Sequence, residues 1–298
     1  MMAGWLARAG ILRKRPPAAQ KKFAVSVVSP PGYIHSLAFA EVAESMHHGL
    51  LELGHDSVLT TDVGLPGRQH IVLGSNLLPK YPLELAQDSI LYNLEQVEAG
   101  GSWFPPELLG IFRRHVVWDY SEKNARTLKS LGVNVARILP IGYVKQLTRI
   151  QLAAEEARDI DVLFIGAWSE RREQVIQQMA ALGLRVGTEF GVYGAQRDAF
   201  LARAKVVLNL HLYNAKVLEM VRISYLLANR CVVLSEWSTE PAVDALVSDG
   251  VAFADYDQLA ARAVELVADL KERQRLSARG FEIMQARSEA DFLRQALG

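Results

Sequence analysis

The chain has 298 residues, half of them apolar, and its 33 Lys and Arg balance 33 Asp and Glu, so the length suits two globular domains and the charge gives no support to non-specific binding of nucleic acid. Its single cysteine, Cys231, excludes an intramolecular disulfide and a cysteine-rich zinc site, and it fits a reducing compartment. No run approaches the ~20 apolar residues of a membrane-spanning helix and the N-terminus lacks a hydrophobic signal core, so we expect a soluble, cytoplasmic protein.

Residues 1–22 form the first segment and carry six Lys or Arg with no acidic residue. Trp5, Leu6, Ile11 and Leu12 stand among the basic residues, so the segment could make a weak contact with an anionic membrane surface. A short, disordered basic tail explains the composition with fewer assumptions, and this is what we expect.

A regular alternation of strands and helices begins at Phe23. The patterns predict a buried strand at 23–29, an amphipathic helix at 37–55 and a second strand at 56–62. The alternation continues to about six strands with interleaved helices, which is typical of a doubly wound parallel sheet. We therefore expect an N-terminal, acceptor-side domain at 23–145.

Residues 142–158 are polar and show no strand pattern, so we place the domain boundary there. The same plan then restarts, with a strand at 159–167, a helix at 169–183 and further strands and helices before a long helical region from Asp257. We expect a second domain at 158–298. The predicted fold is α/β, with two Rossmann-like domains that face a central cleft, the default ligand site.

The candidate binding residues of the second domain follow its predicted strands, because ligands bind at the carboxyl ends of parallel strands. They are Gly166, His211, Tyr213 and Glu236. Arg171 and Arg172 fall in the first turn of the next helix, where the helix dipole disfavours cations. A bound anion, above all a diphosphate, would justify that placement. A solvated arginine pair beside Glu170 and Glu173 is the alternative.

The stretch 218–238 places Glu219 and Arg222 in a helix that is otherwise apolar. Charged residues are rarely buried unless they are paired, and on a helix these two share a face because they are three positions apart. We expect them either to hold a ribose or sugar hydroxyl, with Arg222 orienting it or neutralising phosphate, or to form a buried structural ion pair.

Several common catalytic motifs do not occur. The sequence has no GxGxxG, GxxxxGK[ST], GxSxG or HExxH pattern, so dinucleotide redox, P-loop, hydrolase-triad and zinc chemistry have no positive support. The DID at 159–161 imitates the DxD of metal-dependent glycosyl transfer. It stands at the start of a predicted strand, the wrong end of a parallel sheet for a ligand, and we expect no metal site.

The chain resembles GT-B glycosyltransferases, and more closely the family-1-type transferases related to spore-maturation CgeB-like proteins. The likeness is carried in the second half by FIGAWSERR, LNLHLYNAKVLEMVR and LLANRCVVLSE, and in the first half by SPPGYIHSLAFAEVAESMHHGLLELGH and ILYNLEQ. It spans about 23–287. The resemblance implies that the donor diphosphate sugar is bound by Gly166, Arg171 or Arg172, Glu219, Arg222 and Glu236.

The resemblance also implies a hexosyltransferase-like reaction, from a nucleotide diphosphate sugar to a saccharide or lipid-linked acceptor, as in polysaccharide biosynthesis. Arginines and a helix terminus would stabilise the leaving diphosphate in place of a metal ion, and no cofactor is expected. An inverting reaction needs a base across the cleft, and the candidates are His35, Glu95 and Asp119. His35 ranks first because histidine titrates in a useful range.

A catalytically silent GT-B-like module, which binds a nucleotide sugar or a partner protein, is the alternative function. Many retaining GT-B enzymes carry two glutamates eight positions apart, and here Val217 and Tyr225 stand near their places. A silent module would bind donor without turnover or not at all. A sugar-nucleotide epimerase of the same shape is a third interpretation, which would convert free donor without an acceptor.

Overall fold

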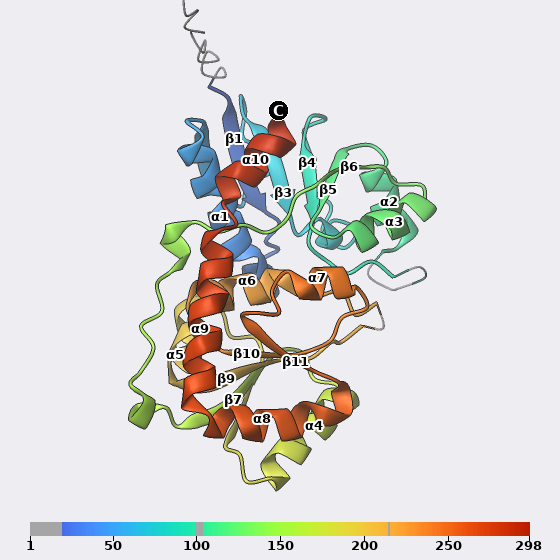
Figure 1. Cartoon of the computed structure of the whole chain (residues 1–298). Helices are drawn as coiled ribbons and strands as arrows, with labels where there is room; N and C mark the ends of the chain where they lie inside the picture. The colour runs from blue at the N-terminus through green and yellow to red at the C-terminus, as the bar shows by residue number, and fades with distance from the viewer. Residues whose placement is uncertain (1–19, 99, 101–103, 214) are drawn as a thin grey trace, which may run out of the picture.

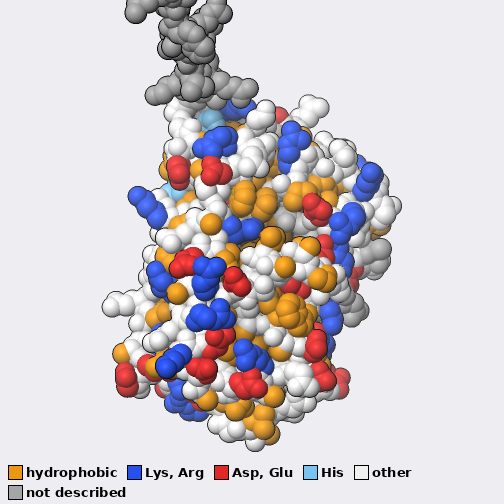
Figure 2. Space-filling model, in the orientation of Figure 1, with side chains coloured by type: hydrophobic (Ala, Val, Ile, Leu, Met, Phe, Trp, Pro, Cys, Tyr) orange, Lys and Arg blue, Asp and Glu red, His pale blue; other side chains and the backbone are white. Residues whose placement is uncertain are grey.

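The computed structural model of the protein describes residues 20–98, 100, 104–213 and 215–298. Most of the predicted basic segment, residues 1–19, lies outside these ranges. Two α/β bodies, each built on a parallel sheet, are stacked along the long axis of the molecule (Figure 1). Lys and Arg side chains are interspersed with Asp and Glu side chains over the face shown in Figure 2, as the balanced composition leads one to expect.

The first sheet has six parallel strands in the order β2-β1-β3-β4-β5-β6. Runs of β-branched and aromatic residues form its buried central strands, and helices cover its faces. The strands are β1 Lys22–Val27, β2 Asp56–Thr60, β3 Gln69–Leu73, β4 Ile90–Asn93, β5 Val116–Asp119 and β6 Val135–Ile138. The helices are η1 Ile34–Phe39 and η2 Ser75–Leu77, both 3-10, with α1 Ala40–Glu52, α2 Pro106–Phe112 and α3 Glu122–Ser130.

The second sheet has five parallel strands in the order β11-β10-β9-β7-β8. Its strands are β7 Ile160–Ile165, β8 Val186–Glu189, β9 Ala204–Asn209, β10 Val233–Glu236 and β11 Val251–Ala254. Its helices are α4 Glu170–Ala181, α5 Gly194–Arg203, α6 Met220–Ala228, α7 Pro241–Ala245, α8 Leu259–Ala268 and α9 Leu270–Gln285, with the 3-10 turn η5 Tyr256–Gln258. The predicted pair of doubly wound, Rossmann-like domains is confirmed.

The strand orders locate a switch point in each sheet. The chain leaves β1 first toward β2 and later returns to its other side as β3, and it does the same around β7 with β8 and β9. Crevices open at the carboxyl ends of strands where the order reverses in this way. The residues that follow β7 and β9 are therefore the expected ligand contacts of the second domain.

The chain crosses between the domains twice. The first crossing, residues 139–158, has only the short 3-10 turns η3 Lys145–Leu147 and η4 Glu155–Ala157. At the second crossing the chain leaves α9 and returns to the first domain as α10 Glu289–Leu297, which packs against α1 (Figure 1). The segment 158–298, predicted as one domain, thus ends with a helix that lies on the other domain, because the apolar face of α10 covers α1.

Two further observations concern the core and the helices. Cys231 is buried just before β10, and this burial raises the pKa of its thiol to about 12, so the thiol stays protonated and unreactive at neutral pH. Within the described ranges, every helix is either too short or too polar to cross a membrane.

Candidate functional site

A cavity of about 430 Å³ lies between the carboxyl ends of the two sheets. Both domains contribute to its wall, as expected for a cleft between Rossmann-like domains. Six of the predicted site residues line it, namely His35, Glu95, Gly166, Tyr213, Glu219 and Arg222.

Gly166, the first residue after β7, allows two guanidinium groups to come close to the main chain. A Cβ placed on Gly166 would lie 3.5 Å from Nη1 of Arg172 and 3.5 Å from Nη2 of Arg222, and 3.1 Å from the ring of Phe164. A larger residue would therefore displace one of the arginines or the ring. The absence of a side chain opens the cavity at the switch point of the second sheet.

Arg172 is almost completely buried behind Gly166 and links the ends of β7 and β9. Its guanidinium donates hydrogen bonds to the carbonyl oxygens of Ala167, at 2.8 Å, and Leu210. Ser169 is the N-cap of α4 and accepts a hydrogen bond from the Arg172 amide, so the helix starts where this cap is available. Burial, together with the charge of Arg222, lowers the pKa of Arg172 to about 10.

Arg222 presents its charge to the cavity from the first turn of α6. Its Nη1 donates to Oδ1 of Asn209 at 3.2 Å. Burial lowers the pKa of Arg222, and the charge of Glu219 opposes this effect. In the part of the chain that the structure describes, no carboxylate is hydrogen-bonded to Arg222 or Arg172. Two positive charges therefore stand side by side with no direct anionic partner.

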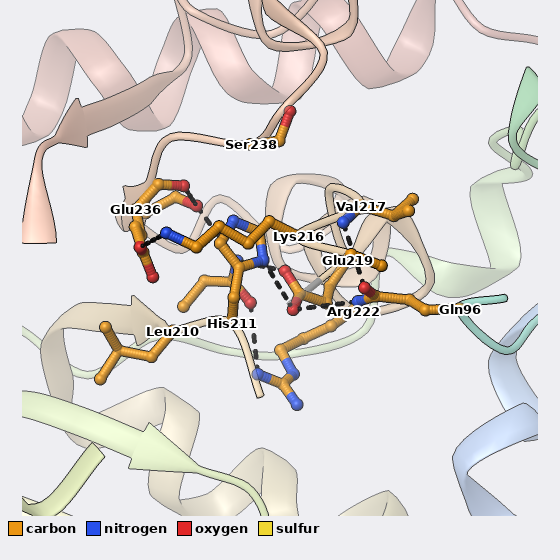
Figure 3. A network of polar contacts seen from close by, with 12 residues as sticks. Gln96, Leu210, His211, Lys216, Val217, Glu219, Arg222, Glu236 and Ser238 are labelled. Carbon is orange, nitrogen blue, oxygen red and sulfur yellow. Dashed lines mark hydrogen bonds and ion pairs between the residues drawn. The ribbon is translucent and has the colours of Figure 1, made fainter. Parts of the chain in front are cut away.

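Glu219 is the N-cap residue of α6, and three side chains hold its carboxylate (Figure 3). Oε1 accepts from His211 Nδ1 at 3.0 Å and from Gln96 Nε2 of the first domain at 3.3 Å, and Oε2 accepts from Asn209 Nδ2 at 2.8 Å. Burial would raise the pKa of Glu219, but the His211 hydrogen bond and the charges of His211 and Arg222 bring it below its ordinary value. Glu219 is therefore ionised.

His211 supports Glu219 from behind the cavity wall. It is buried, and its two ring nitrogens face Glu219 Oε1 and the carbonyl oxygen of Trp237, at 3.0 and 3.2 Å. A carboxylate and a carbonyl oxygen can only accept, so both ring nitrogens donate when the two hydrogen bonds are formed together. Because Glu219 pairs with His211 and Arg222 with Asn209, the direct Glu219–Arg222 ion pair of the alternative interpretation is not formed.

Comparison with known proteins gives the fold a name. No family model matches the chain. The uncharacterized protein L138 of Acanthamoeba polyphaga mimivirus is 26% identical over 154 residues, which are 51% of this chain and 15% of that protein. The chain thus spans about a seventh of the length of this relative.

Three solved structures cover both domains. They are AviGT4, a glycosyltransferase involved in avilamycin A biosynthesis (TM-score 0.57, 16% identity, 93% of this chain and 96% of that chain), the sucrose-phosphate synthase of Thermosynechococcus elongatus (0.60, 12%, 93% and 98%), and an α-glucosyltransferase in complex with UDP and a 13-mer DNA (0.58, 10%, 92% and 97%). The chain has the GT-B fold. These likenesses concern the fold, and the CgeB-like subgroup stays a prediction.

Four residues predicted to contact the donor lie outside the lining of the GT-B cleft, namely Arg172 and His211, which support it from behind, and Arg171 and Glu236. Arg171 forms an ion pair with Glu236, and its guanidinium lies 4.0 Å from the centroid of the Tyr256 ring. Lys216 Nζ donates to the same carboxylate at 2.9 Å. Arg171 and Glu236 are therefore held by each other, whereas Arg172, the neighbour in sequence, approaches Gly166.

Asp119, a predicted base, does not reach the cavity. It is fully buried at the end of β5 and accepts hydrogen bonds from Asn93 Nδ2 at 2.6 Å, Asn124 Nδ2 at 3.1 Å and the Ser121 amide at 2.8 Å. Burial raises the pKa of Asp119 to about 7 against the effect of these hydrogen bonds. The same two amide groups donate to the Glu95 carbonyl oxygen at 2.9 Å, so Asp119 shapes the loop that carries Glu95.

His35 and Glu95 reach the cavity from the first domain. His35 Nδ1 and the Tyr193 hydroxyl are 2.7 Å apart, in a hydrogen bond that joins the two domains. Glu95 accepts from Asn76 Nδ2 at 3.4 Å, and burial raises the pKa of its carboxyl to about 7. Both side chains face the same cavity as Arg222.

Other lining residues were not among the predicted set. Tyr193 comes four residues after the end of β8, in the kind of loop where the rule on strand ends places ligand contacts. Tyr33 and Arg197 also line the cavity. Arg197 pairs with Glu41, 156 positions away, and no local pattern signals such a contact.

The aspartates of the DID stretch lie at the amino end of β7, far from the carboxyl ends of the strands, as predicted. Asp159 pairs with Arg203, and Asp161 pairs with Arg185 at 2.8 Å and Lys205 at 2.9 Å. Over the described ranges of the chain, no three His, Cys, Asp or Glu side chains gather in a way that could hold a metal ion.

Proposed function

We propose that the protein transfers a sugar from a nucleotide diphosphate sugar to an acceptor hydroxyl held by the first domain, without a metal ion or other cofactor. The observation that carries this proposal is the pair of guanidinium groups of Arg222 and Arg172 beside Gly166, where the second sheet has its switch point. Solved proteins of the same fold are named as glycosyltransferases, and one is bound to UDP, which supports the assignment.

In this proposal the second domain binds the donor. Gly166 lets the diphosphate approach the main chain, and Arg222 donates hydrogen bonds to it while Arg172 adds positive charge from behind. Glu219 accepts a hydrogen bond from a ribose or sugar hydroxyl, since His211 and Asn209 keep its carboxylate ionised and fixed. Arg171 and Glu236 hold the surrounding loops together.

The chemical step is a displacement at the anomeric carbon. The acceptor oxygen forms a bond to that carbon as its bond to the diphosphate oxygen breaks, and the acceptor proton passes to a base. Glu95 and His35 face the cavity from the acceptor side and are the proposed bases for an inverting reaction. Negative charge develops on the departing diphosphate, where Arg222 and Arg172 stabilise it.

We propose a saccharide or lipid-linked saccharide as the acceptor, in the cytoplasm, as in the polysaccharide biosynthesis that the CgeB-like resemblance implies. The apolar and aromatic part of the wall supports a sugar acceptor, because the rings of Tyr33, Phe190 and Tyr193 surround His35 at centroid distances of 5.3, 5.1 and 6.0 Å. Sugar rings pack well on such apolar faces.

A thermal-shift screen against UDP-, GDP-, ADP-, TDP- and CMP-sugars tests donor binding. A ligand at ~100 times its Kd should add about 2.7 kcal/mol to the native state. We expect one donor class to stabilise the wild type and to lose most of this effect with Arg222→Gln. Arg203→Gln is the matched control, because Arg203 forms an exposed ion pair at the opposite edge of the same sheet.

A second assay separates the transferase from its alternatives. Release of nucleoside diphosphate that requires an added saccharide acceptor supports transfer. Donor binding without release, over a broad acceptor panel, would indicate the silent module, and epimerised free donor would indicate the epimerase. Stabilisation by no donor, or an equal effect in both arginine variants, contradicts the proposed site.

A further inference from the structure

A second cavity, of about 500 Å³, lies between the domains on the other side of the α6 N-terminus. Its wall is formed by the end of β6 and the start of α3 in the first domain, and by α7 with Val217, Leu218 and Met220 in the second. It shares no lining residue with the first cavity, because Leu218 and Met220 face it whereas Glu219 and Arg222 face the first. The proposed donor site does not use it.

The wall of this second cavity is largely apolar. Ile141, Leu218, Met220 and Val243 line it, and two large side chains at its mouth stay in contact with solvent, Leu246 at 61% exposure and Ile138 at 38%. A concave, apolar space of this volume is in the range of small-molecule sites. Covering Leu246 and Ile138 would remove apolar surface from water, which favours an apolar ligand.

Arg287 is the cation of this cavity that forms no direct ion pair. Its Nε is buried without a hydrogen-bond partner, and within the described residues its side chain forms no hydrogen bond or ion pair and lies 5.4 Å from the Phe292 ring centroid. Burial lowers the pKa of Arg287, and the charge of the nearby Glu289 opposes this effect in part. The other cation in the wall, Arg126, is neutralised by Glu240 at 3.2 Å and Glu122 at 3.6 Å. A partly buried guanidinium in apolar surroundings favours a bound anion.

Arg287 also lies where the chain crosses between the domains for the second time. Its carbonyl oxygen accepts a hydrogen bond from the Tyr143 amide at 2.6 Å, so the two crossings lie side by side. Pro140 and Ile141 of the first crossing line the same cavity. A ligand there contacts both domains at once, and its affinity depends on how they are oriented.

We propose that this second cavity binds an amphiphile with a single anionic head, a carboxylate or a phosphate monoester, on an apolar body. Arg287 holds the head through its planar fork of N–H donors, and Ile138, Leu218, Met220 and Leu246 cover the apolar body. The proposal does not depend on the glycosyl transfer proposed for the first cavity.

Isothermal titration of the full chain with decanoate and decyl phosphate, below their micelle concentrations, tests the proposal. Acetate, inorganic phosphate, 1-decanol and decyltrimethylammonium separate the contributions of head, body and charge. We expect at least one anionic amphiphile to bind saturably at one site per chain. Its affinity should be at least tenfold higher than that of acetate or inorganic phosphate, and at least tenfold higher than that of decyltrimethylammonium.

Two variants locate the site. Arg287→Gln should weaken binding of the anionic amphiphile at least tenfold, and Leu246→Asp, at an exposed position, should also weaken it. Arg126→Gln is the matched control and should leave the affinity within about threefold, because its charge is already neutralised. Equal binding of the decyl cation, no binding of either anion up to the micelle concentration, or an unchanged affinity in Arg287→Gln with a wild-type melting curve would overturn the proposal.

Discussion

Glu41 of α1 accepts a hydrogen bond from Arg197 of α5 at 2.8 Å, and this ion pair joins the two domains beside the first cavity. Arg197 also pairs with Asp198 at 2.8 Å and lies 4.2 Å from the centroid of the Tyr225 ring. Arg149, from the first crossing, reaches Glu41 at 3.4 Å. The Glu41 carboxylate of the first domain is thus paired with Arg197 of the second domain and Arg149 of the first crossing. These contacts fix the orientation of the domains at the cavity.

Glu41→Gln should lower the free energy of unfolding by about 3 kcal/mol, the lower end of the range for a broken buried ion pair, because Asp198 still pairs with Arg197. Urea denaturation measures this change. Glu122→Gln is the control with the same substitution, since the Glu122 side chain is 76% exposed in its ion pair with Arg126 and should change stability by less than about 0.5 kcal/mol. Equal effects of the two substitutions would contradict a linking role for Glu41.

Asn229 ties the first crossing to α6, and Asn229→Asp should weaken that attachment. Its Oδ1 accepts from the amides of Arg149 and Ile150 at 2.8 and 2.9 Å, and its Nδ2 donates to the carbonyl oxygens of Leu147 and Tyr225 at 2.9 Å. An aspartate would lose both donors and face two carbonyl oxygens, so we expect a loss of about 3 kcal/mol.

Hydrogen exchange gives the local measure of the Asn229→Asp prediction. The amides of Arg149 and Ile150 should exchange faster in the variant than in the wild type, relative to the core of either sheet. The exposed Asn134→Asp serves as the control and should be close to neutral. Unchanged protection of both amides would show that Asn229 is not what holds the crossing.

Gly142→Ala should destabilise the docking of α10. A Cβ on Gly142 would lie 2.6 Å from the Cα and 2.7 Å from the amide nitrogen of Glu289, where the backbone cannot yield without moving the helix. We expect a loss of more than about 2 kcal/mol, seen as a lower melting temperature. Gly110→Ala in α2 has room and should stabilise by about 0.5 kcal/mol. A neutral Gly142→Ala would mean that α10 is not packed closely here.

Glu289 should make the protein less stable as pH rises from about 4.5 to 7. The buried carboxyl accepts a hydrogen bond from the Gly142 amide at 2.7 Å, yet burial raises its pKa from 4.5 to about 7. Between these values the folded state keeps a proton that the unfolded state has lost, so the free energy of unfolding falls with pH and the loss is complete above 7.

Glu289→Gln removes this titration and tests it. The free energy of unfolding of the variant, minus that of the wild type, should increase by about 3 kcal/mol between pH 4 and pH 8. Urea denaturation at several pH values measures it. Asp119 and Glu95 contribute the same slope to both proteins and cancel in the difference. A difference that does not change with pH would contradict this role of Glu289.

Glu95→Gln should abolish a large part of the proposed transfer and leave donor binding intact. The amide cannot accept the acceptor proton, and loss of a general base typically costs 10²–10⁴-fold in rate. Because only ionised Glu95 acts as a base and its pKa is about 7, the wild-type rate should rise with pH through 7. A variant with wild-type turnover and the same pH profile would move the role of base to His35.

Much of the architecture could be predicted from the sequence because strands, helices and the domain crossing each have a characteristic local pattern of apolar and polar residues. The buried run at 23–29 and the strand at 159–167 are recognisable from their β-branched residues, and the polar residues at 142–158 mark a crossing. The rule on strand ends led to Gly166, and the charged pair in an otherwise apolar helix led to Glu219; both residues line the cavity. These residues act where the chain itself places them, at the carboxyl end of a parallel strand or the start of a helix.

Only the tertiary structure decided that Arg172, and not its neighbour Arg171, approaches Gly166. Arg171 instead forms an ion pair with Glu236, 65 positions away in the sequence. The tertiary structure also buries Asp119 in the core and packs α10 against α1 of the first domain. Such choices depend on partners that are distant in the sequence and on the burial that raises or lowers a pKa, and neither is encoded in the spacing of neighbouring residues. The sequence by itself therefore determined the fold class and the end of the strands at which the candidate site lies, and long-range packing determined which side chains face its cavity.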